Sequence, residues 1–382
     1  MAQKLKFGNG TWATKKGSTL AYNDENSNFK PIPFTTTRDS IATRVNKEGL
    51  IEVVSNDVPR IDYTDSADGA LLLEPARTNL VTYSEDFSNW NTIQSSLTSD
   101  YGISPDGSTN STRCVFSSSN QSLELTVSAS NVIATIYIKG TIGETIQFGT
   151  NGAEEIFTLS GDWQRLEKYN SSSVSRVTLN TYAGVTARDV EIWGAQLEQG
   201  SYPTSYIPTN GSAITRVADT ANGAGNSEVF NDSEGTIFLD TNFKNSSGVQ
   251  ILCSVHDFAT NKRLEIWANN NLINGFIGGS SNINVGSSNL INGSHKIALN
   301  YKSGNSSFYI DGFLIGSSNS SFTISALTKM NLSYLDGVQF TSISPTKEIG
   351  YYDEILTDLE LETLTSYRSL NELVTELNLN EL

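Results

Sequence analysis

The carboxylates are the side chains of this sequence whose spacing could most directly do chemistry. Retaining glycosidases need two carboxyl groups about 5–5.5 Å apart, and inverting ones about 6.5–9.5 Å apart. One strand provides a close pair through Glu-x-Asp-x-Glu, because alternate residues share a face. No such triplet stands on an expected strand, and the nearest cluster, Asp358, Glu360 and Glu362, falls at an expected helix start. Helix capping and solvation explain that cluster.

Cysteine and histidine spacing predicts no metal site and no other catalytic group. Cys114 and Cys253 lie far apart in the sequence, which argues against a disulfide framework. The two histidines, His256 and His295, show no zinc-binding spacing, and zinc needs three or four ligands. The nucleophile motif GxSxG and the phosphate-binding motif GxxxxGK[ST] are absent as well. We therefore expect no catalytic residues, no metal and no cofactor.

Sugar binding needs different side chains: an aromatic ring for the C–H face of a sugar, and amides or carboxylates for its hydroxyls. In the second half of the sequence, such residues lie on or beside expected loops, and the candidates are His256, Asp257, Trp267, Asn269, Asn270 and Asn271. In the alternative interpretation, Trp267 is a core residue and the asparagines form an ordinary hairpin loop.

The net charge excludes several classes of partner. The 382 residues include 25 Lys+Arg and 41 Asp+Glu, a formal charge of -16, and only 17% are charged. Without a basic stripe, we expect no nucleic-acid partner and no docking on an anionic membrane. No apolar run approaches the roughly 18 residues of a transmembrane helix, and no apolar stretch follows the first lysines as in a secretory signal.

Short alternating segments predict an all-β protein with two β-sandwiches in series. In NVIATIYIKG (131–140) every second residue is apolar, and similar segments recur between Gly, Asn and Ser turns. In SFYIDGFLIG (307–316), Asp311-Gly312 predicts a hairpin with a type I′ turn. We expect Trp163 and Trp193 to be core residues rather than sugar platforms.

Composition shifts divide the chain into five segments, with one helix at the end. They are an N-terminal arm and β-hairpin attachment region (1–79), a first sandwich (80–208), a linker (209–225), a second sandwich (226–356) and an amphipathic helix (357–382). Thr357 and Glu360 form a capping-box pattern at the helix start. We expect its first turns to pack on the second sandwich, and 370–382, which carries leucines at helical spacing, to self-associate.

Three sequence segments resemble segments shared by tailed-phage virion proteins. They are RDSIATRVNKEGLIEVVSNDVPRIDY (38–63), LLLEPARTNLVTYSEDFSNW (71–90) and EIWGAQLEQGSYPTSYIPTNGSAITRVAD (191–219). In that group they frame a jelly roll resembling carbohydrate-binding modules, which a concanavalin A-like (laminin G-like) sandwich commonly follows. HKIALNYKSGNSSFYIDGFLIGSS (295–318) is similar to the strand–hairpin pattern of that second fold. Within these framework segments, we expect Glu74 and Arg77 to pair or to bond to nearby backbone.

The resemblance implies a non-enzymatic structural protein of a phage particle, a head or tail fibre or appendage that contributes to adhesion to host-surface glycan. The N-terminal arm would hold it to other virion proteins, and self-association would give a homotrimer. It would be assembled in the host cytoplasm and exposed on the virion surface. Two alternatives stay open: a purely structural decoration or connector protein, and a polysaccharide depolymerase.

Overall fold

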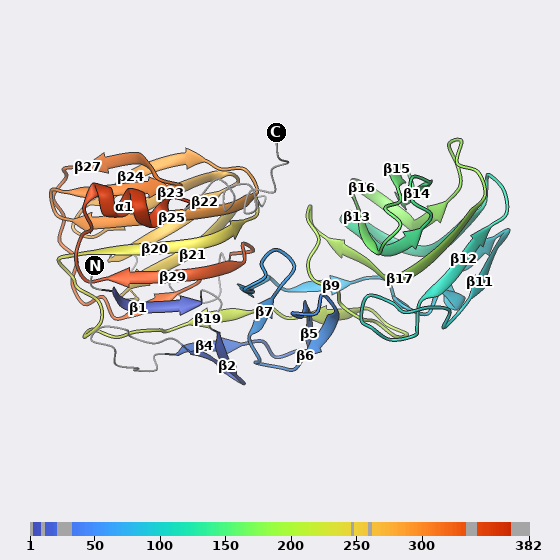
Figure 1. Cartoon of the computed structure of the whole chain (residues 1–382), viewed down its shortest axis with the longest axis horizontal. Coiled ribbons are helices and arrows are strands. Elements are labelled where there is room, and N and C mark those ends of the chain that lie inside the picture. Colours follow the sequence, from blue (N-terminus) through green and yellow to red (C-terminus); the bar gives the residue numbers. More distant parts are fainter. Residues whose placement is uncertain are drawn as a thin grey trace. The chain divides into compact units, whose positions relative to one another are not determined.

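The computed structural model describes residues 3–8, 12–20, 33–245, 248–258, 262–333 and 342–367. Strands make up most of these residues, together with one short α-helix, so the predicted all-β class is confirmed. The chain divides into two compact units (Figure 1). Unit 1 contains 1–39, 54–75 and 218–382, and unit 2 contains 40–53 and 76–217. Among the described residues, no helix has the length and hydropathy needed to cross a membrane.

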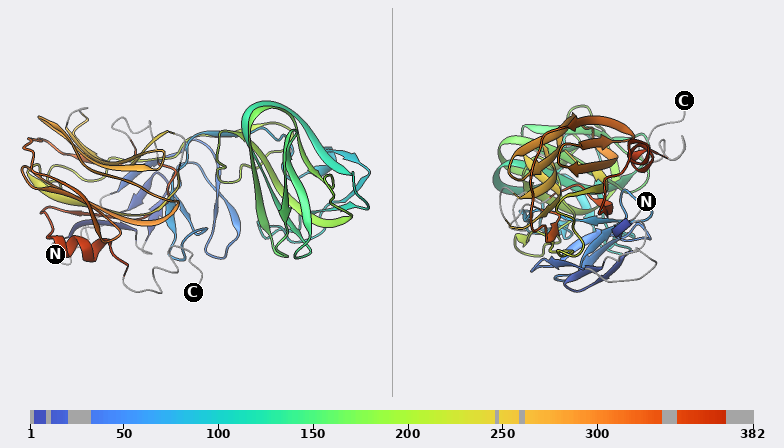
Figure 2. Two further views of the ribbon diagram at one scale, coloured as in Figure 1. Left: turned by 90° about the horizontal axis from the view of Figure 1, so that it is seen from above. Right: turned by 90° about the vertical axis from the view of Figure 1, so that its left-hand side faces the viewer.

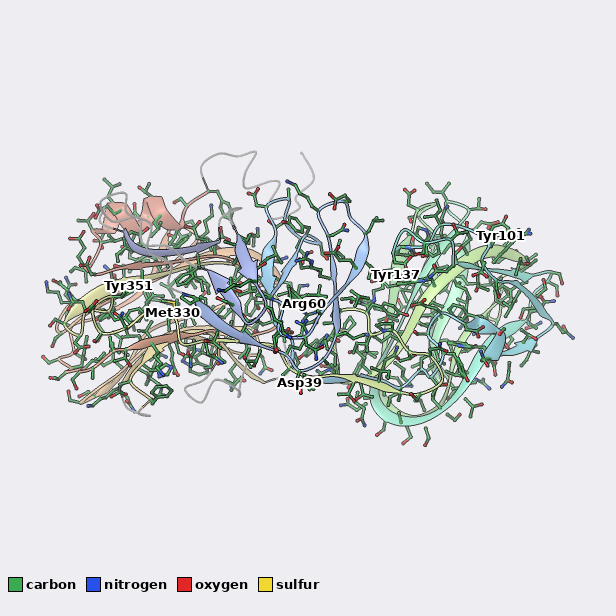
Figure 3. The ribbon with its side chains drawn as sticks, turned by 90° about the horizontal axis from the view of Figure 1, so that it is seen from below. Asp39, Arg60, Tyr101, Tyr137, Met330 and Tyr351 are labelled. Atoms are coloured by element: carbon green, nitrogen blue, oxygen red, sulfur yellow. The ribbon has the colours of Figure 1, made fainter. Side chains whose placement is uncertain are left out.

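Unit 1 is built around two sheets that share one core. The larger has the order β27-β26-β25-β20-β29-β8-β7, with β1 also paired to β29, and the smaller has the order β24-β23-β22-β21-β28. Their bounds are β1 Gln3–Gly8, β7 Arg60–Asp62, β8 Ala70–Leu72, β20 Glu234–Phe243, β21 Val249–His256, β22 Arg263–Asn269, β23 Leu272–Gly278, β24 Asn282–Asn289, β25 Gly293–Lys302, β26 Ser306–Ile310, β27 Phe313–Ser318, β28 Lys329–Asn331 and β29 Thr346–Tyr352. Alternate apolar residues of both sheets fill the core, as Met330 and Tyr351 do in Figure 3.

A third, four-stranded sheet of unit 1 joins chain segments that are far apart in the sequence. It has the order β19-β4-β3-β2, and the strands are β2 Ala13–Lys15, β3 Ser18–Leu20, β4 Phe34–Thr37 and β19 Thr220–Asn222. The last of these strands lies in the segment predicted as a linker (209–225), where Asp219 and Ala221 are buried.

The helix α1 (Asp358–Thr365) covers the outer face of the larger sheet, as Figure 2 also shows. Leu361 is fully buried there against Phe238, Tyr309 and Tyr352. This packing confirms the prediction for the first turns of the helix. The segment 370–382, for which we expected self-association, lies outside the described residues.

The capping box at Thr357 and Glu360 is confirmed, and it predicts a measurable contribution to stability. The Thr357 side chain accepts from the Glu360 N–H, and the Glu360 carboxylate accepts from the Thr357 N–H. We expect Thr357→Ala to lower the free energy of unfolding of unit 1 by about 1 kcal/mol in urea titrations. Thr363→Ala is the matched control, because Thr363 lies within the same helix and only bonds back to the Leu359 carbonyl. Equal losses from both variants would contradict a capping role.

The predicted hairpin at Asp311-Gly312 is also confirmed. These two residues join β26 to β27, with φ angles of 51° and 84°. Positive φ at both central residues is the signature of a type I′ turn, whose twist matches that of the flanking strands. The local sequence thus determines this connection.

Unit 2 has one eight-stranded, strongly bent sheet around a separate core. Its order is β11-β12-β17-β13-β16-β14-β15, with β10 paired to β13. The strands are β10 Asn91–Ile93, β11 Ser95–Thr98, β12 Thr112–Phe116, β13 Ser122–Gly140, β14 Thr145–Thr150, β15 Ala153–Thr158, β16 Gln164–Asn180 and β17 Arg188–Gln199. The short strand pairs β5 (Ala42–Val45) with β6 (Ile51–Val54), and β9 (Arg77–Asn79) with β18 (Ile214–Arg216), complete the sheets.

Trp193 is buried in unit 2, which confirms that it is a core residue. Its ring packs on Tyr206, with centroids 4.6 Å apart, and the two rings form a small cluster with Ile51. The prediction of a core residue is wrong for Trp163, which packs against the same cluster but is only partly buried. Its indole N–H donates to the Ile103 carbonyl at 3.0 Å.

Four buried charged residues of unit 1 form one network, and they correct the prediction for Glu74. Arg60, labelled in Figure 3, donates to the Glu74 carboxylate at 2.8 Å and also to Asp219. Arg38 donates to the other oxygen of Asp219 at 2.9 Å. Arg77 donates to its neighbouring Ala76 carbonyl, which confirms the local backbone bond expected for it. Glu74 forms its ion pair with Arg60 of β7, 14 positions earlier in the sequence.

Candidate functional site on the outer face of the five-stranded sheet

The five-stranded sheet of unit 1 has an apolar inner face and a mixed polar and aromatic outer face. On β22, Leu264, Ile266 and Ala268 are fully buried in the core. Side chains alternate along a strand, so the residues between them face outward. These outward residues are Arg263, Glu265, Trp267 and Asn269.

Trp267 lies in the middle of a row that crosses four strands. It is opposite Ile251 of β21 and Asn274 of β23, and Asn274 is in turn opposite Ser287 of β24. Trp267 is partly exposed, whereas Ile251 and Asn274 are buried beside it. The alternative interpretation of Trp267 as a core residue therefore does not hold. Its ring lies between an apolar neighbour and an amide neighbour, which is a suitable arrangement for the C–H and hydroxyl groups of a sugar.

The amide neighbour is held in a fixed orientation. The Asn274 side chain donates to the Leu272 carbonyl at 3.1 Å, and its oxygen accepts from the Ser287 hydroxyl at 2.6 Å. Asn284 is exposed and donates to Ser287 at 2.9 Å and to Asn274 at 3.4 Å. This network costs a ligand little ordering entropy, because the polar groups are already positioned.

An ion pair occupies the next positions of the same face. Arg263 Nε lies 2.9 Å from Glu265 Oε1, and the guanidinium lies over the Phe276 ring, 4.7 Å from its centroid. Glu265 is only 3% exposed. Burial raises the pKa of its carboxyl group, and the charge and hydrogen bonding of Arg263 oppose that shift. The two charges therefore compensate each other on the sheet.

The predicted candidates His256 and Asp257 lie at the far end of β21. His256 is directly opposite Arg263 and is fully buried, and its Nδ1 accepts from the Phe258 N–H at 3.0 Å. Burial lowers the pKa of His256 to about 4, with Asp257 opposing and Lys329 reinforcing the shift. Asp257 forms an ion pair with Lys262 at 3.7 Å. A buried neutral imidazole is a structural group here rather than a contact for a sugar.

The predicted asparagines form the turn between β22 and β23. Asn269, Asn270 and Asn271 are exposed, and Asn270 has a φ of 53°, which asparagine tolerates well. The Asn270 N–H donates to the Gly248 carbonyl at 3.0 Å. At a rise of about 3.3 Å per residue, this turn lies roughly 20 Å from the His256 end. The structure therefore brings Trp267 and Asn269 onto one face but leaves His256 and Asp257 apart from them.

Sequence reasoning found Asn269 but missed the other residues of the Trp267 face. Arg263 and Glu265 could have been found from the strict alternation of RLEIWAN (263–269), which places them on that face. Asn274 and Asn284 could not, because only the register between strands places them beside that ring. Among the residues that the structure describes, no group of three or more His, Cys, Asp or Glu side chains is suited to hold a metal ion.

Comparison with known proteins assigns no family. No protein-family model matches this sequence, and no curated protein matches it. Among solved structures, the sialidase CBM40 of Ruminococcus gnavus bound to α2,3-sialyllactose aligns at 15% identity and a TM-score of 0.33, covering 38% of this chain and 94% of that one. The sialidase of Trypanosoma rangeli aligns at 12% identity and a TM-score of 0.29, covering 91% of this chain and 65% of that one.

The prediction of a non-enzymatic protein is corrected by these comparisons. Structures that align over 91% of the chain are sialidases, so the exclusion of an enzyme is contradicted. The search for paired carboxylates considered only one strand or one helix start, whereas the fold brings side chains of different strands to one face, as it does Glu265 of β22 and Phe276 of β23. At these TM-scores the alignments assign no activity to this chain. It is similar to solved carbohydrate-binding and sialidase structures at low identity, and no family follows from that.

Proposed function

We propose that this chain binds glycan through the outer face of the five-stranded sheet, as a surface-exposed component of a phage particle. The observation that carries the proposal is Trp267, a partly exposed indole flanked on the same face by the fixed amide of Asn274 and the exposed amide of Asn269. An aromatic ring with amides beside it is the combination that sugar recognition uses.

The assignment to a phage particle is supported by the three sequence segments 38–63, 71–90 and 191–219, which resemble segments of virion proteins. In this proposal the protein is a fibre or appendage component, and the bound glycan belongs to the host surface. Contacts with other virion proteins through the N-terminal region and assembly as a homotrimer are further parts of the same proposal. Native mass spectrometry tests the assembly, and a stable monomer at micromolar concentration would contradict the trimer.

Trp267→Ala is the direct test of glycan binding. We expect it to abolish most of the signal on a glycan array, because the aromatic platform for the sugar C–H face is lost. Phe313→Ala is the matched control, since Phe313 is 72% exposed on β27 of the other sheet. Circular dichroism checks that both variants are folded. Unchanged binding by folded Trp267→Ala would contradict the proposed site.

A purely structural decoration or connector protein is the second candidate function. The negative net charge and the high strand content are equally compatible with a purely structural protein. It predicts coating of particles without any glycan-array signal. The array therefore separates the two functions.

A further inference from the structure

We infer that the ligand of the Trp267 face is an electrically neutral glycan rather than an acidic one. The inference rests on the proposed function and names the class of sugar that this site would take.

In the row of Trp267 and on its turn side, every residue that the strand register places around this ring is neutral. These neighbours come from β21, β22, β23 and β24, and they are Val249, Ile251, Asn269, Leu272, Asn274, Asn284, Ser287 and Asn289. On the other side along β22 the next residue of this face is a carboxylate, Glu265, which is paired with Arg263. Carboxylate recognition in proteins relies on charge-assisted hydrogen bonds, above all from arginine. Around this ring the sheet offers amides, a hydroxyl and apolar groups instead. Such groups suit the hydroxyls and C–H faces of a neutral sugar.

The cations elsewhere on the same face are engaged at its opposite end. Arg263, the nearest of them along β22, has its charge compensated by Glu265 at 2.9 Å and its flat surface over Phe276. Lys329 of β28 lies over the Phe258 ring at 4.0 Å, at the end where His256 is buried. An acidic sugar stacked on Trp267 would thus find the cations Arg263 and Lys329 at the His256 end of the face rather than beside the ring.

The net charge of the whole chain also disfavours binding of an acidic glycan. A formal charge of -16 produces a negative potential that lowers the local concentration of anionic ligands, and salt screens this repulsion. A neutral glycan experiences neither effect. Its binding should therefore depend little on ionic strength.

The test is an array of neutral oligosaccharides and their counterparts that carry a sialic or uronic acid, probed with the full chain at low and high salt. We expect binding to neutral members, with little salt dependence, and several-fold weaker binding to acidic counterparts. Preference for the acidic members would overturn the inference but leave the proposed function standing. The absence of binding to any member, at either salt concentration, would overturn the proposed function and the inference together.

Glu265→Gln tests whether the ion pair keeps positive charge away from the ligand. This substitution removes the negative charge 2.9 Å from Arg263 and so makes the face more positive, and the ratio of acidic to neutral binding should rise several-fold at low salt. Glu234→Gln is the matched control, because Glu234 pairs with Lys302 at 2.7 Å on the larger sheet. A folded Glu265→Gln protein with the wild-type ratio would overturn the inference. The comparison on the wild-type protein decides the question if that variant does not fold.

Discussion

Asp219→Asn is expected to unfold unit 1 under conditions in which the wild-type protein is fully folded. Its carboxylate accepts from Arg38 at 2.9 Å, from Arg60, and from the Glu74 N–H at 3.0 Å, and all of these residues are buried. Removing one partner of a buried ion network leaves uncompensated charge in the interior, at a cost of about 3–5 kcal/mol. Such a loss is a large part of the stability of a typical domain. Hydrogen exchange of β20, β25 and β29 in urea measures it.

The matched control for this prediction is Asp189→Asn. Asp189 also forms a two-point contact with an arginine, Arg113, but its side chain is 53% exposed. An exposed pair contributes about 1 kcal/mol or less, so this variant should unfold close to the wild type. Equal losses in the free energy of unfolding from the two variants would contradict the larger contribution expected from the buried network around Asp219.

His256→Asn is expected to reduce the acid sensitivity of unit 1. Between pH 6.5 and the folded-state pKa of about 4, the unfolded chain binds a proton that the buried imidazole does not. Each pH unit in this window costs about 1.4 kcal/mol, so acidification destabilises the wild-type protein through this residue by roughly 3 kcal/mol. Asparagine keeps a hydrogen-bond acceptor near the Phe258 N–H but does not titrate. Urea titrations at pH 7, 5.5 and 4.5 should show a smaller fall in the variant.

The control for the pH dependence is His295→Gln, which should act in a different window. Burial disfavours the charged form of His295, but the bond from its Nδ1 to Asp311 at 2.6 Å and the charge of that carboxylate raise its pKa overall. Its contribution is therefore complete below pH 6.5 and is lost as pH rises through the raised pKa. Below pH 6.5, the free energy of unfolding should fall with decreasing pH in His295→Gln as steeply as in the wild-type protein. A flatter acid slope in this variant than in His256→Asn would contradict the assignment.

Features determined within a few residues could be predicted from the sequence. The turn at Asp311-Gly312 and the capping box at Thr357 and Glu360 depend on backbone angles and on contacts three residues apart. The pairing of Arg60 with Asp219 could not be predicted, because these residues are 159 positions apart and meet only in the folded unit. The same reason explains why only local partners, Arg77 or nearby backbone, were expected for Glu74.

The candidate site shows the same limit. Alternation within 263–269 places Trp267 and Asn269 on one side of a strand, and the sequence alone supports that much. Which side faces the core, and which residues of β23 and β24 lie beside the indole, depends on the register between strands. The grouping of His256 with the asparagines was a judgement from loop position, and the length of β22 separates them.

The pairing of β1 with β29 has a consequence for the order in which the two units can form during synthesis. β1 ends at Gly8 and its partner begins at Thr346, so more than three hundred residues must emerge before the pair can exist. At roughly 5–20 residues per second, the ribosome takes about 20 to 70 s to supply them. All of unit 2 has been made by residue 217, so it can complete its core first. In unit 1, β1 must remain without its partner until β29 is released.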